Sequence, residues 1–458
     1  MSAVPEVAHL HRASTRLSSR EAGVLVAACL GAMVTFFLIT ASVSSLGAIG
    51  ADLAVAPASL VWVPSSYTLV VASLILTAGS AGDRWGRRRA FVCGTLVLAA
   101  AAVLVLSTRT FGALLAGELL AGVGGALVLP NSLSIVSLTF ADPHRRTEAI
   151  TTWVASSGLG LAVGPLAAGW VLLHHDWRLT FVPVIVLSLL ATGLALSLVT
   201  DSRHPDAELD FAGAVLGTVA IGGFVYGLVG GGQHGYDDPR SLTAFAAAAV
   251  AAAVFVDVER RVRRPMLDVR LLANPAFAAV MVVAGVALFG FTGLAITLVL
   301  HFESDLGLDA LATGWRLLPL FLAYVVVAMA AGRLVRRAGF RVPLVAGLVL
   351  VAAASLGLAS QVDAAGYLRV WPALIAIGAG IALVAAPSTA AAIAGVRPEE
   401  AGMAASAVNA ARQVGSVMGS SFVGSVVVAH GVQLGVEVVA GVFAASAVLA
   451  ALLVPAKQ

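Results

Sequence analysis

Charged side chains are scarce in this chain. Only 11% of its 458 residues are charged, whereas a soluble domain carries about 25%, and 60% are hydrophobic. So little charge cannot cover a surface that faces water. The composition therefore excludes a disordered protein and argues against a soluble enzyme. It favours a polytopic membrane protein, because apolar runs longer than about 18 residues are typical of spanning helices.

Cysteine and nucleotide-binding loops are also scarce or absent. Cys29 and Cys93 both lie in apolar segments, which gives neither a disulfide framework nor a metal site. The sequence has no Gly-x4-Gly-Lys-[Ser/Thr] loop for a nucleotide, and His174 and His175 are one isolated pair. The net charge of +3 is too small to indicate nucleic-acid binding. We expect no enzyme, no metal and no cofactor, with a proton gradient as the energy source.

Long apolar runs dominate what is present. Each is about long enough to cross the ~30 Å hydrocarbon layer as a helix, although the eighth is at the short limit. The fourteen segments are 23–48, 58–80, 89–107, 111–137, 147–172, 179–199, 211–231, 241–257, 276–301, 312–331, 342–360, 367–392, 402–429 and 434–454. The first is too long for a cleavable signal and lacks a clear small-residue cleavage site.

The basic residues predict the orientation. An even number of spans puts both termini on one side of the membrane. With that side inside, 21 of the 27 Lys and Arg residues fall on the cytoplasmic face and only 4 in outer loops. We expect a multi-pass protein of the plasma or inner membrane with both termini in the cytoplasm. The bias towards Arg and Ala suggests a bacterial source.

The two halves of the chain resemble each other at an offset of 253 to 256 residues. The matching segments are 79–88 with 332–341, 122–128 with 378–384, and 160–164 with 415–419. Because both copies keep one orientation, the repeats are parallel and related by an axis along the membrane normal. We expect a six-helix bundle over 1–200, a two-helix linker insert over 201–270 and a second six-helix bundle over 271–458, with the substrate site between the bundles.

Five motifs resemble those of a known family. They are Gly79-Ser-Ala-Gly-Asp83-Arg84-Trp-Gly86-Arg87-Arg88-Arg89, Trp62-x4-Tyr67-x-Leu69, Gly160-x3-Gly164-Pro165-x3-Gly169, Trp177-Arg178-x2-Phe181 and Arg412-x2-Gly415. Over nearly its whole length the chain resembles the major facilitator superfamily. More narrowly, it is similar to the fourteen-helix drug:proton antiporter branch, the QacA/EmrB-like exporters.

The resemblance implies an all-α membrane protein with the major facilitator fold. It implies a secondary active transporter that exports hydrophobic or amphipathic drugs, or antibiotic-like metabolites, in exchange for protons by alternating access. Such a protein contributes to antibiotic resistance. Its expected partners are a small substrate, protons and the lipid bilayer, and we expect it to be a monomer.

Two departures from the family pattern concern proton coupling. The family has an Asp in its first helix, where this chain reads Phe37-Leu38-Ile39-Thr40, and an Arg in its fourth helix, where this chain has Glu118. These departures leave open a facilitator or importer of a small organic metabolite with no proton step. A non-transporting membrane sensor is a more distant alternative.

The first motif has two interpretations. Its arginines orient a helix end in any membrane protein. They do not explain the glycines, which permit a tight turn and close backbone approach, or the acid, which is favoured at a helix N-terminus by ~0.3–1 kcal/mol. The resemblance suggests that this helix is the thirteenth, beginning near Gly402. The hypothesis is a cytoplasmic gate formed by Gly79, Asp83, Arg84, Gly86, Arg87 and Arg88.

The antiporter motif likewise has a structural and a functional interpretation. Gly160, Gly164 and Gly169 are the small residues that close helix packing in a membrane uses. Pro165 removes one backbone donor and bends the helix. In the related exporters this helix seals the cavity between the two bundles. The two interpretations are compatible.

Two charges are expected inside the bilayer. Glu118 lies about 10 Å deep from the outer side, where an ionised carboxylate costs about 2.5–3.5 kcal/mol. It is suited to load and release a proton or to attract a cation, and the structural alternative is a neutral Glu hydrogen-bonded between helices. Arg412 is suited to balance Glu118, to bind an anionic substrate group or to bind helix-end carbonyls. Arg316 is expected to extend to the interface.

The walls of the cavity must supply the rest of the substrate site. Aromatic and amide side chains suit amphipathic organic molecules, although any one of them can instead pack or face lipid. The candidates are Phe36, Trp62, Tyr67, Asn131, Trp153, Phe289, Phe291 and Asn409.

Overall fold

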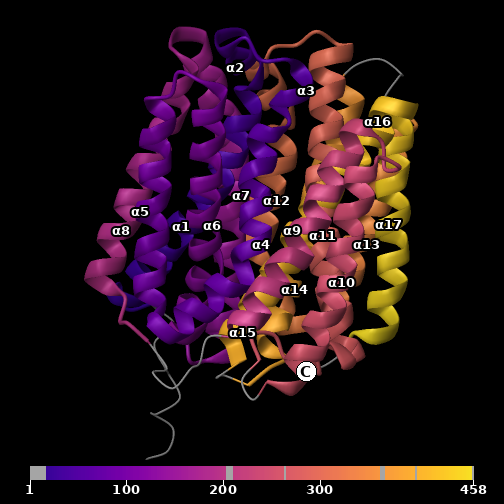
Figure 1. Cartoon of the computed structure of the whole chain (residues 1–458). Helices are drawn as coiled ribbons and strands as arrows, with labels where there is room; N and C mark the ends of the chain where they lie inside the picture. Colours follow the sequence, from indigo (N-terminus) through magenta and orange to yellow (C-terminus); the bar gives the residue numbers. More distant parts are fainter. Residues whose placement is uncertain (1–16, 203–209, 263–264, 362–366, 398–399, 456–458) are drawn as a thin grey trace, which may run out of the picture.

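The computed structural model describes residues 17–202, 210–262, 265–361, 367–397 and 400–455. This part of the chain consists of helices and short connections and contains no strand (Figure 1). Several residues of the charge argument lie outside the described residues, namely Arg12, Arg16, Arg203, Arg263, Arg264 and Lys457.

The first half of the chain forms six long helices. They are α1 (Ser19–Ser44), α4 (Trp62–Trp85), α5 (Arg87–Leu106), α6 (Phe111–Thr139), α7 (Pro143–His174) and α8 (Val182–Leu198). Two short helices, α2 (Leu46–Leu53) and α3 (Pro57–Leu60), connect α1 to α4, and a 3-10 turn at Trp177–Phe181 leads into α8.

The rest of the chain continues this pattern after an insert of two helices. The insert consists of α9 (Phe211–His234) and α10 (Pro239–Arg261). The second half comprises α11 (Pro275–Leu300), α12 (Ala310–Ala338), α13 (Arg341–Ala359), α14 (Tyr367–Ala394), α15 (Ala401–Met418), α16 (Gly424–His430) and α17 (Val432–Leu453).

Among the described residues, thirteen helices are long and apolar enough to cross a membrane. The remaining predicted segment is the thirteenth, 402–429, which is helical from Ala401 to His430 but changes pitch on the way. It is divided into α15, a wider π turn at Gly419–Val423 and α16. α15 carries polar side chains such as Asn409, Arg412 and Gln413, which lower its apolar character.

The internal repeat is visible in the packing. In the first half α1 packs against α7 and α8, and α5 against α6 and α8; in the second half α11 packs against α15 and α17, and α13 against α14 and α17. Glycines permit equivalent approaches. A Cβ on Gly94 would lie 2.8 Å from the carbonyl oxygen of Gly124, and one on Gly347 would lie 2.6 Å from that of Gly380. The repeat predicted from the sequence therefore has the same helix contacts in both copies.

Two seams join the halves. α7 packs against α12, and α4 packs against α15; we call these the α7–α12 seam and the α4–α15 seam. The insert helix α9 packs against α4 of the first half and also contacts α15 and α16 of the second. We call the end of the bundle that holds residues 79–89 the motif end, which lies at the bottom of Figure 1 together with the label of α15. The other is the opposite end.

Candidate functional site

Asp83 lies at the motif end of the α4–α15 seam. Arg87, the first residue of α5, donates to Asp83 Oδ1 from Nε at 2.8 Å and from Nη2 at 2.7 Å. A Cβ on Gly402 would lie 2.7 Å from the same oxygen. The Asp83 carboxylate therefore sits against the first turn of α15, where the positive end of the helix dipole favours an anion. This is the position that the family resemblance implies.

The neighbouring contacts of this seam depend on small residues. A Cβ on Gly79 would lie 1.8 Å from Ser406 Oγ, and one on Gly82 would lie 1.7 Å from Asn131 Oδ1. Asn131 Nδ2 donates to the carbonyl of Ala78 at 3.1 Å, so this amide ties α6 to α4. A role of Asn131 as a cavity wall stays a prediction.

Asp201, which the sequence argument missed, holds the turn between α4 and α5. One of its carboxylate oxygens accepts from the backbone N–H of Arg88 at 3.3 Å, and the other pairs with Arg89 at 3.1 Å. Gly86 has φ +111°, and a Cβ there would lie 2.4 Å from Asp201 Oδ1, so both conformation and space require glycine. Arg84 is exposed at the end of α4. The signal in the sequence that could have identified Asp201 is an acidic residue just after the apolar segment 179–199.

At the motif end, the α7–α12 seam is held by an ion pair between its two helices. Arg336 Nη1 lies 2.7 Å from Glu148 Oε1, and a Cβ on Gly332 would lie 3.1 Å from Glu148 Cα. Further along, a Cβ on Gly158 would lie 2.2 Å from the Tyr324 ring. The sequence argument singled out none of Glu148, Tyr324 and Arg336 as a site residue.

The antiporter motif packs α7 on both sides. A Cβ on Gly160 would lie 2.2 Å from the carbonyl oxygen of Met33 in α1, and one on Gly164 would lie 1.9 Å from Thr40 Oγ1. A Cβ on Gly169 would lie 2.9 Å from Leu311 Cα in α12. The helix continues past Pro165 to His174. The spacing of the glycines thus fits close packing of α7 against one helix of each half.

Glu118 is 1% exposed and lies towards the opposite end. Its Oε1 accepts from Ser42 Oγ in α1 at 2.8 Å, whereas Oε2 has no hydrogen-bond partner among the described residues. The hydroxyl of Tyr67 is close enough to Glu118 to interact with its charge, and it donates to the carbonyl of Thr35 at 3.2 Å. The result is a buried carboxyl group held by one hydroxyl.

Arg412 is also 1% exposed, in the middle of the protein. Its guanidinium carbon lies 5.9 Å from the centre of the Trp153 ring, and none of its three nitrogens has a hydrogen-bond partner among the described residues. The side chain of Tyr324 is close enough to Arg412 to interact with its charge. No ion pair described in the structure joins Arg412 to Glu118. The sequence hypothesis that the two charges balance each other has no support in this conformation.

The other predicted cavity residues do not form one cluster but lie in different parts of the described structure. Phe289 and Phe36 are buried, and Phe291 packs against Tyr324 with ring centres 5.2 Å apart, next to the Arg412 region. Trp62 instead lies against Tyr226 of the insert, at 5.6 Å. Asn409 Nδ2 donates within its own helix to the carbonyl of Ala405.

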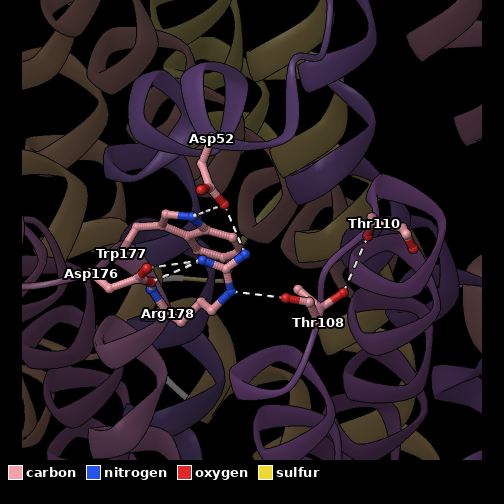
Figure 2. A network of polar contacts seen from close by, with 6 residues as sticks. All are labelled: Asp52, Thr108, Thr110, Asp176, Trp177 and Arg178. Carbon is pink, nitrogen blue, oxygen red and sulfur yellow. Dashed lines mark hydrogen bonds and ion pairs between the residues drawn. The ribbon is translucent and has the colours of Figure 1, made fainter.

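A polar network fixes the opposite end of the first half (Figure 2). Asp52 accepts from the Trp177 indole at 3.2 Å and from Arg178 at 2.8 Å, and Arg178 also pairs with Asp176 and donates to the carbonyl of Thr108. The hydrogen bond from Trp177, together with that from Arg178, lowers the pKa of Asp52 below its ordinary value. The motif at Trp177 and Arg178 is therefore part of a connection between loops.

Comparisons with known proteins agree with this architecture. The family model described as Major Facilitator Superfamily matches residues 28–420 and, in a second match, residues 280–458. The chain is 30% identical to the multidrug resistance protein Stp of Mycobacterium tuberculosis, over 88% of this chain and 75% of that protein. It is 33% identical to the puromycin resistance protein pur8 of Streptomyces alboniger, over 83% and 77%.

A solved structure shows the same fold. The human organic anion transporter MFSD10 superposes with a TM-score of 0.72 at 16% identity, covering 94% of this chain and 99% of that one. Together with the sequence matches and the repeated helix packing, this shows that the chain belongs to the Major Facilitator Superfamily, a family of transporters and not of enzymes, in its drug-efflux branch.

Proposed function

We propose that the protein exports hydrophobic or amphipathic organic molecules from the cell in exchange for protons. The relatives named for multidrug and puromycin resistance support export as the direction and drug-like molecules as the substrates. The aromatic side chains around the seams suit such molecules. The motif end is the cytoplasmic end in this proposal, as the distribution of basic residues predicts.

The observation that carries proton exchange is the state of Glu118. This carboxyl group is 1% exposed and lies between α6 and α1 of the first half, with one oxygen bound by Ser42 and the other without a partner among the described residues. Acids inside a membrane protein mark ion and proton pathways by default. When the halves move and water reaches Glu118, it releases a proton, and when they close it must carry one or pair with a cation.

The Asp83–Arg87 contact supplies the gate in this proposal. Asp83 is held by Arg87 and by the N-terminus of α15, which contributes ~0.3–1 kcal/mol. The Asp83–Arg87 pair lies within the first half and positions the carboxylate, whereas the contact of Asp83 with α15 joins the two halves only while the motif end is closed. The contact with α15 therefore stabilises the conformation in which the cavity opens towards the outside.

One observation favours a second candidate, a facilitator without proton exchange. Leu38 is 1% exposed in α1, at the position where related exporters have an acid, so α1 offers no carboxylate to the centre. In the proton-exchange proposal Glu118 then acts without a second acid at this position of α1. The experiment below separates the two functions.

The test is proton release from energised inverted vesicles when rhodamine 123 is added. The parent chain is expected to release protons, and Glu118→Gln is expected to release none. Exchange of labelled for unlabelled rhodamine 123 needs no net proton movement, so we expect it to survive in Glu118→Gln. Glu437→Gln, in α17 and bonded only to Gln433 in the described structure, is the matched control. Release that survives in Glu118→Gln assigns the proton step elsewhere, and exchange by the parent without release favours the facilitator.

A further inference from the structure

Arg412 is the least satisfied charged side chain in the described part of the chain. It is 1% exposed, and its Nε, Nη1 and Nη2 all lack a hydrogen-bond partner among the described residues. A guanidinium carries five N–H donors in a fixed plane and stays charged in proteins. Burying such a group without acceptors costs several kcal/mol. A feature that is so costly and lies at the centre of a transporter indicates a ligand.

Neither Glu118 nor Asp83 supplies the missing acceptor among the described residues. Arg412 lies eleven residues past the start of α15 at the motif end, about 16 Å along the helix, whereas Glu118 lies seven residues past the start of α6 at the opposite end, about 10 Å along it. In a bundle of this length the two groups are about 15 Å apart in depth. Asp83 is held by Arg87 and lies beside Gly402, within the first turn of α15. Arg412 lies ten residues further along that helix, about 15 Å away.

The surroundings of Arg412 are aromatic and fixed. The Trp153 indole donates to Ser132 Oγ at 3.0 Å, which holds its ring with the centre 5.9 Å from the guanidinium. Tyr324 is close enough to interact with the charge of Arg412, and its ring packs against Phe291 with ring centres 5.2 Å apart. These side chains come from α7, α12 and α11, so residues of both halves meet at Arg412.

We infer that Arg412 binds the carboxylate of an aromatic organic acid, with the aromatic part of that acid beside Trp153 and Tyr324. The planar guanidinium matches a carboxylate through two parallel hydrogen bonds. The two rings are buried in this conformation and become contact area for an aromatic body when the halves move apart. This deepens the proposed export function, on which it rests, by naming its substrate class. Because the ligand touches both halves, its binding and the movement of the halves are coupled.

The test compares two dyes that differ at one group. Rhodamine 110 has a free carboxylate, and rhodamine 123 is its methyl ester. Binding to the purified full chain in lipid nanodiscs is measured by fluorescence anisotropy. We expect the parent chain to bind rhodamine 110 about tenfold or more tightly than rhodamine 123, since hydrogen bonds to charged groups contribute on that scale.

Substitutions locate the effect. Arg412→Gln is expected to remove the preference for rhodamine 110, and Arg412→Lys to keep part of it. Arg316→Gln is the matched control, because Arg316 also lies over aromatic rings, those of Phe302 and Tyr367, but towards the opposite end. The unfolding temperature without dye checks folding, and Arg412→Gln is expected to unfold at a higher temperature because an unpaired buried charge is gone.

The inference is overturned if the parent chain binds rhodamine 123 as well as rhodamine 110, if it binds neither, or if the preference survives in Arg412→Gln. A titration with chloride against gluconate adds one more outcome. If chloride stabilises the parent chain through Arg412 and no carboxylate preference exists, the occupant is an inorganic anion and the inference is wrong.

The two proposals fail in different ways. An anion preference that depends on Arg412, without substrate-driven proton release by any dye, contradicts proton exchange and leaves the anion site standing. Proton-coupled transport of rhodamine 123 with no preference for rhodamine 110 contradicts the anion site and leaves proton exchange standing.

Discussion

The two seams between the halves are related by the internal repeat, yet they are built differently. Asp83 in α4 and Arg336 in α12 occupy equivalent positions, 253 residues apart. Asp83 pairs with Arg87, which is 2% exposed, and touches the N-terminus of α15; Arg336 and Glu148 are each 41% exposed. An exposed pair contributes about 0–1 kcal/mol, whereas breaking a buried one costs about 3–5 kcal/mol. The Asp83–Arg87 pair is thus the more buried, but it lies within one half and positions Asp83 against α15, whereas the Arg336–Glu148 pair itself crosses between the halves.

The extent of the seams differs as well. Glycine contacts join α7 to α12 at the motif end through Gly332, in the middle through Gly158 and at the opposite end through Gly169. The corresponding contacts of α4 with α15, through Gly79 and Gly402, lie at the motif end. Glycine contacts along the whole length of a seam fit the proposed axis, and glycine contacts at one end fit the proposed gate. Duplicated sequence has thus produced two seams with different glycine contacts.

A disulfide across each seam gives the largest expected effect. In a chain with Cys29 and Cys93 replaced by Ser, Gly79→Cys with Ser406→Cys is expected to abolish transport on oxidation and to recover it with a reductant. A Cβ on Gly79 would lie 2.9 Å from Ser406 Cβ, so a small shift reaches the 3.5–4.5 Å that a disulfide needs.

The equivalent pair across the α7–α12 seam is the control for this experiment. Gly332→Cys with Thr151→Cys is expected to keep most transport, because a Cβ on Gly332 lies 2.9 Å from Thr151 Oγ1 in a seam that stays packed. Equal loss with both disulfides would show that the two seams open together.

Removing one charge from each seam gives the next effect. Asp83→Asn is expected to lower the transport rate by about tenfold or more with expression unchanged, because Arg87 is left buried without its partner. Glu148→Gln is expected to change the rate by less than about twofold, as for other exposed pairs. Dye efflux from cells that express equal amounts of each variant measures both. Normal efflux by Asp83→Asn rules out the gate.

Equivalent glycines compare packing within the halves. Gly160 and Gly415 each face a backbone carbonyl, at 2.2 Å from Met33 and 2.0 Å from Gly285 for an added Cβ. Alanine at either is expected to lower the free energy of unfolding by about 1–3 kcal/mol, because a backbone cannot yield as a flexible side chain does.

The repeat also offers a matched control for these glycines. Gly424 is the equivalent of Gly169, and a Cβ there would meet nothing within 4 Å. Gly424→Ala is expected to be neutral or slightly stabilising. Denaturant unfolding in detergent measures all three variants. A loss for Gly424→Ala as large as that for Gly160→Ala would contradict the assignment of these costs to close backbone contact.

The smallest effect concerns the opposite end and its response to pH. The pKa of Asp52 is lowered in the folded chain by hydrogen bonds from Trp177 and Arg178. A lowered pKa contributes stability that is present above the unfolded value, about 3.9 for Asp, and is lost as the pH falls below it. The difference in unfolding temperature between the parent chain and Asp52→Asn is therefore expected to shrink below about pH 4. A difference that grows in acid would contradict this sign.

Much of the architecture followed from short-range features of the sequence. Apolar runs predicted the spans, and thirteen of them are matched by apolar helices of the described chain. Matching glycines such as Gly79 and Gly332 predicted the repeat. The π turn at Gly419–Val423 was not predicted, because apolar periodicity does not report a local change of helical pitch. The polar partners Ser42, Glu148 and Asp201 were also missed, since common residue types carry no signal when their partners are distant in the sequence.

The sequence by itself determined that the chain spans a membrane, that it contains a duplicated bundle and that it resembles drug exporters. These conclusions rest on composition, on run length and on motifs, which are properties of neighbouring residues. The tertiary structure alone decided how the few buried charges are satisfied. Glu118 has a hydroxyl partner on α1, Asp83 has Arg87 and a helix end, and Arg412 has aromatic rings beside it but no hydrogen-bond partner among the described residues. Whether a buried charge is paired depends on which helices meet at its depth, and that depends on the fold.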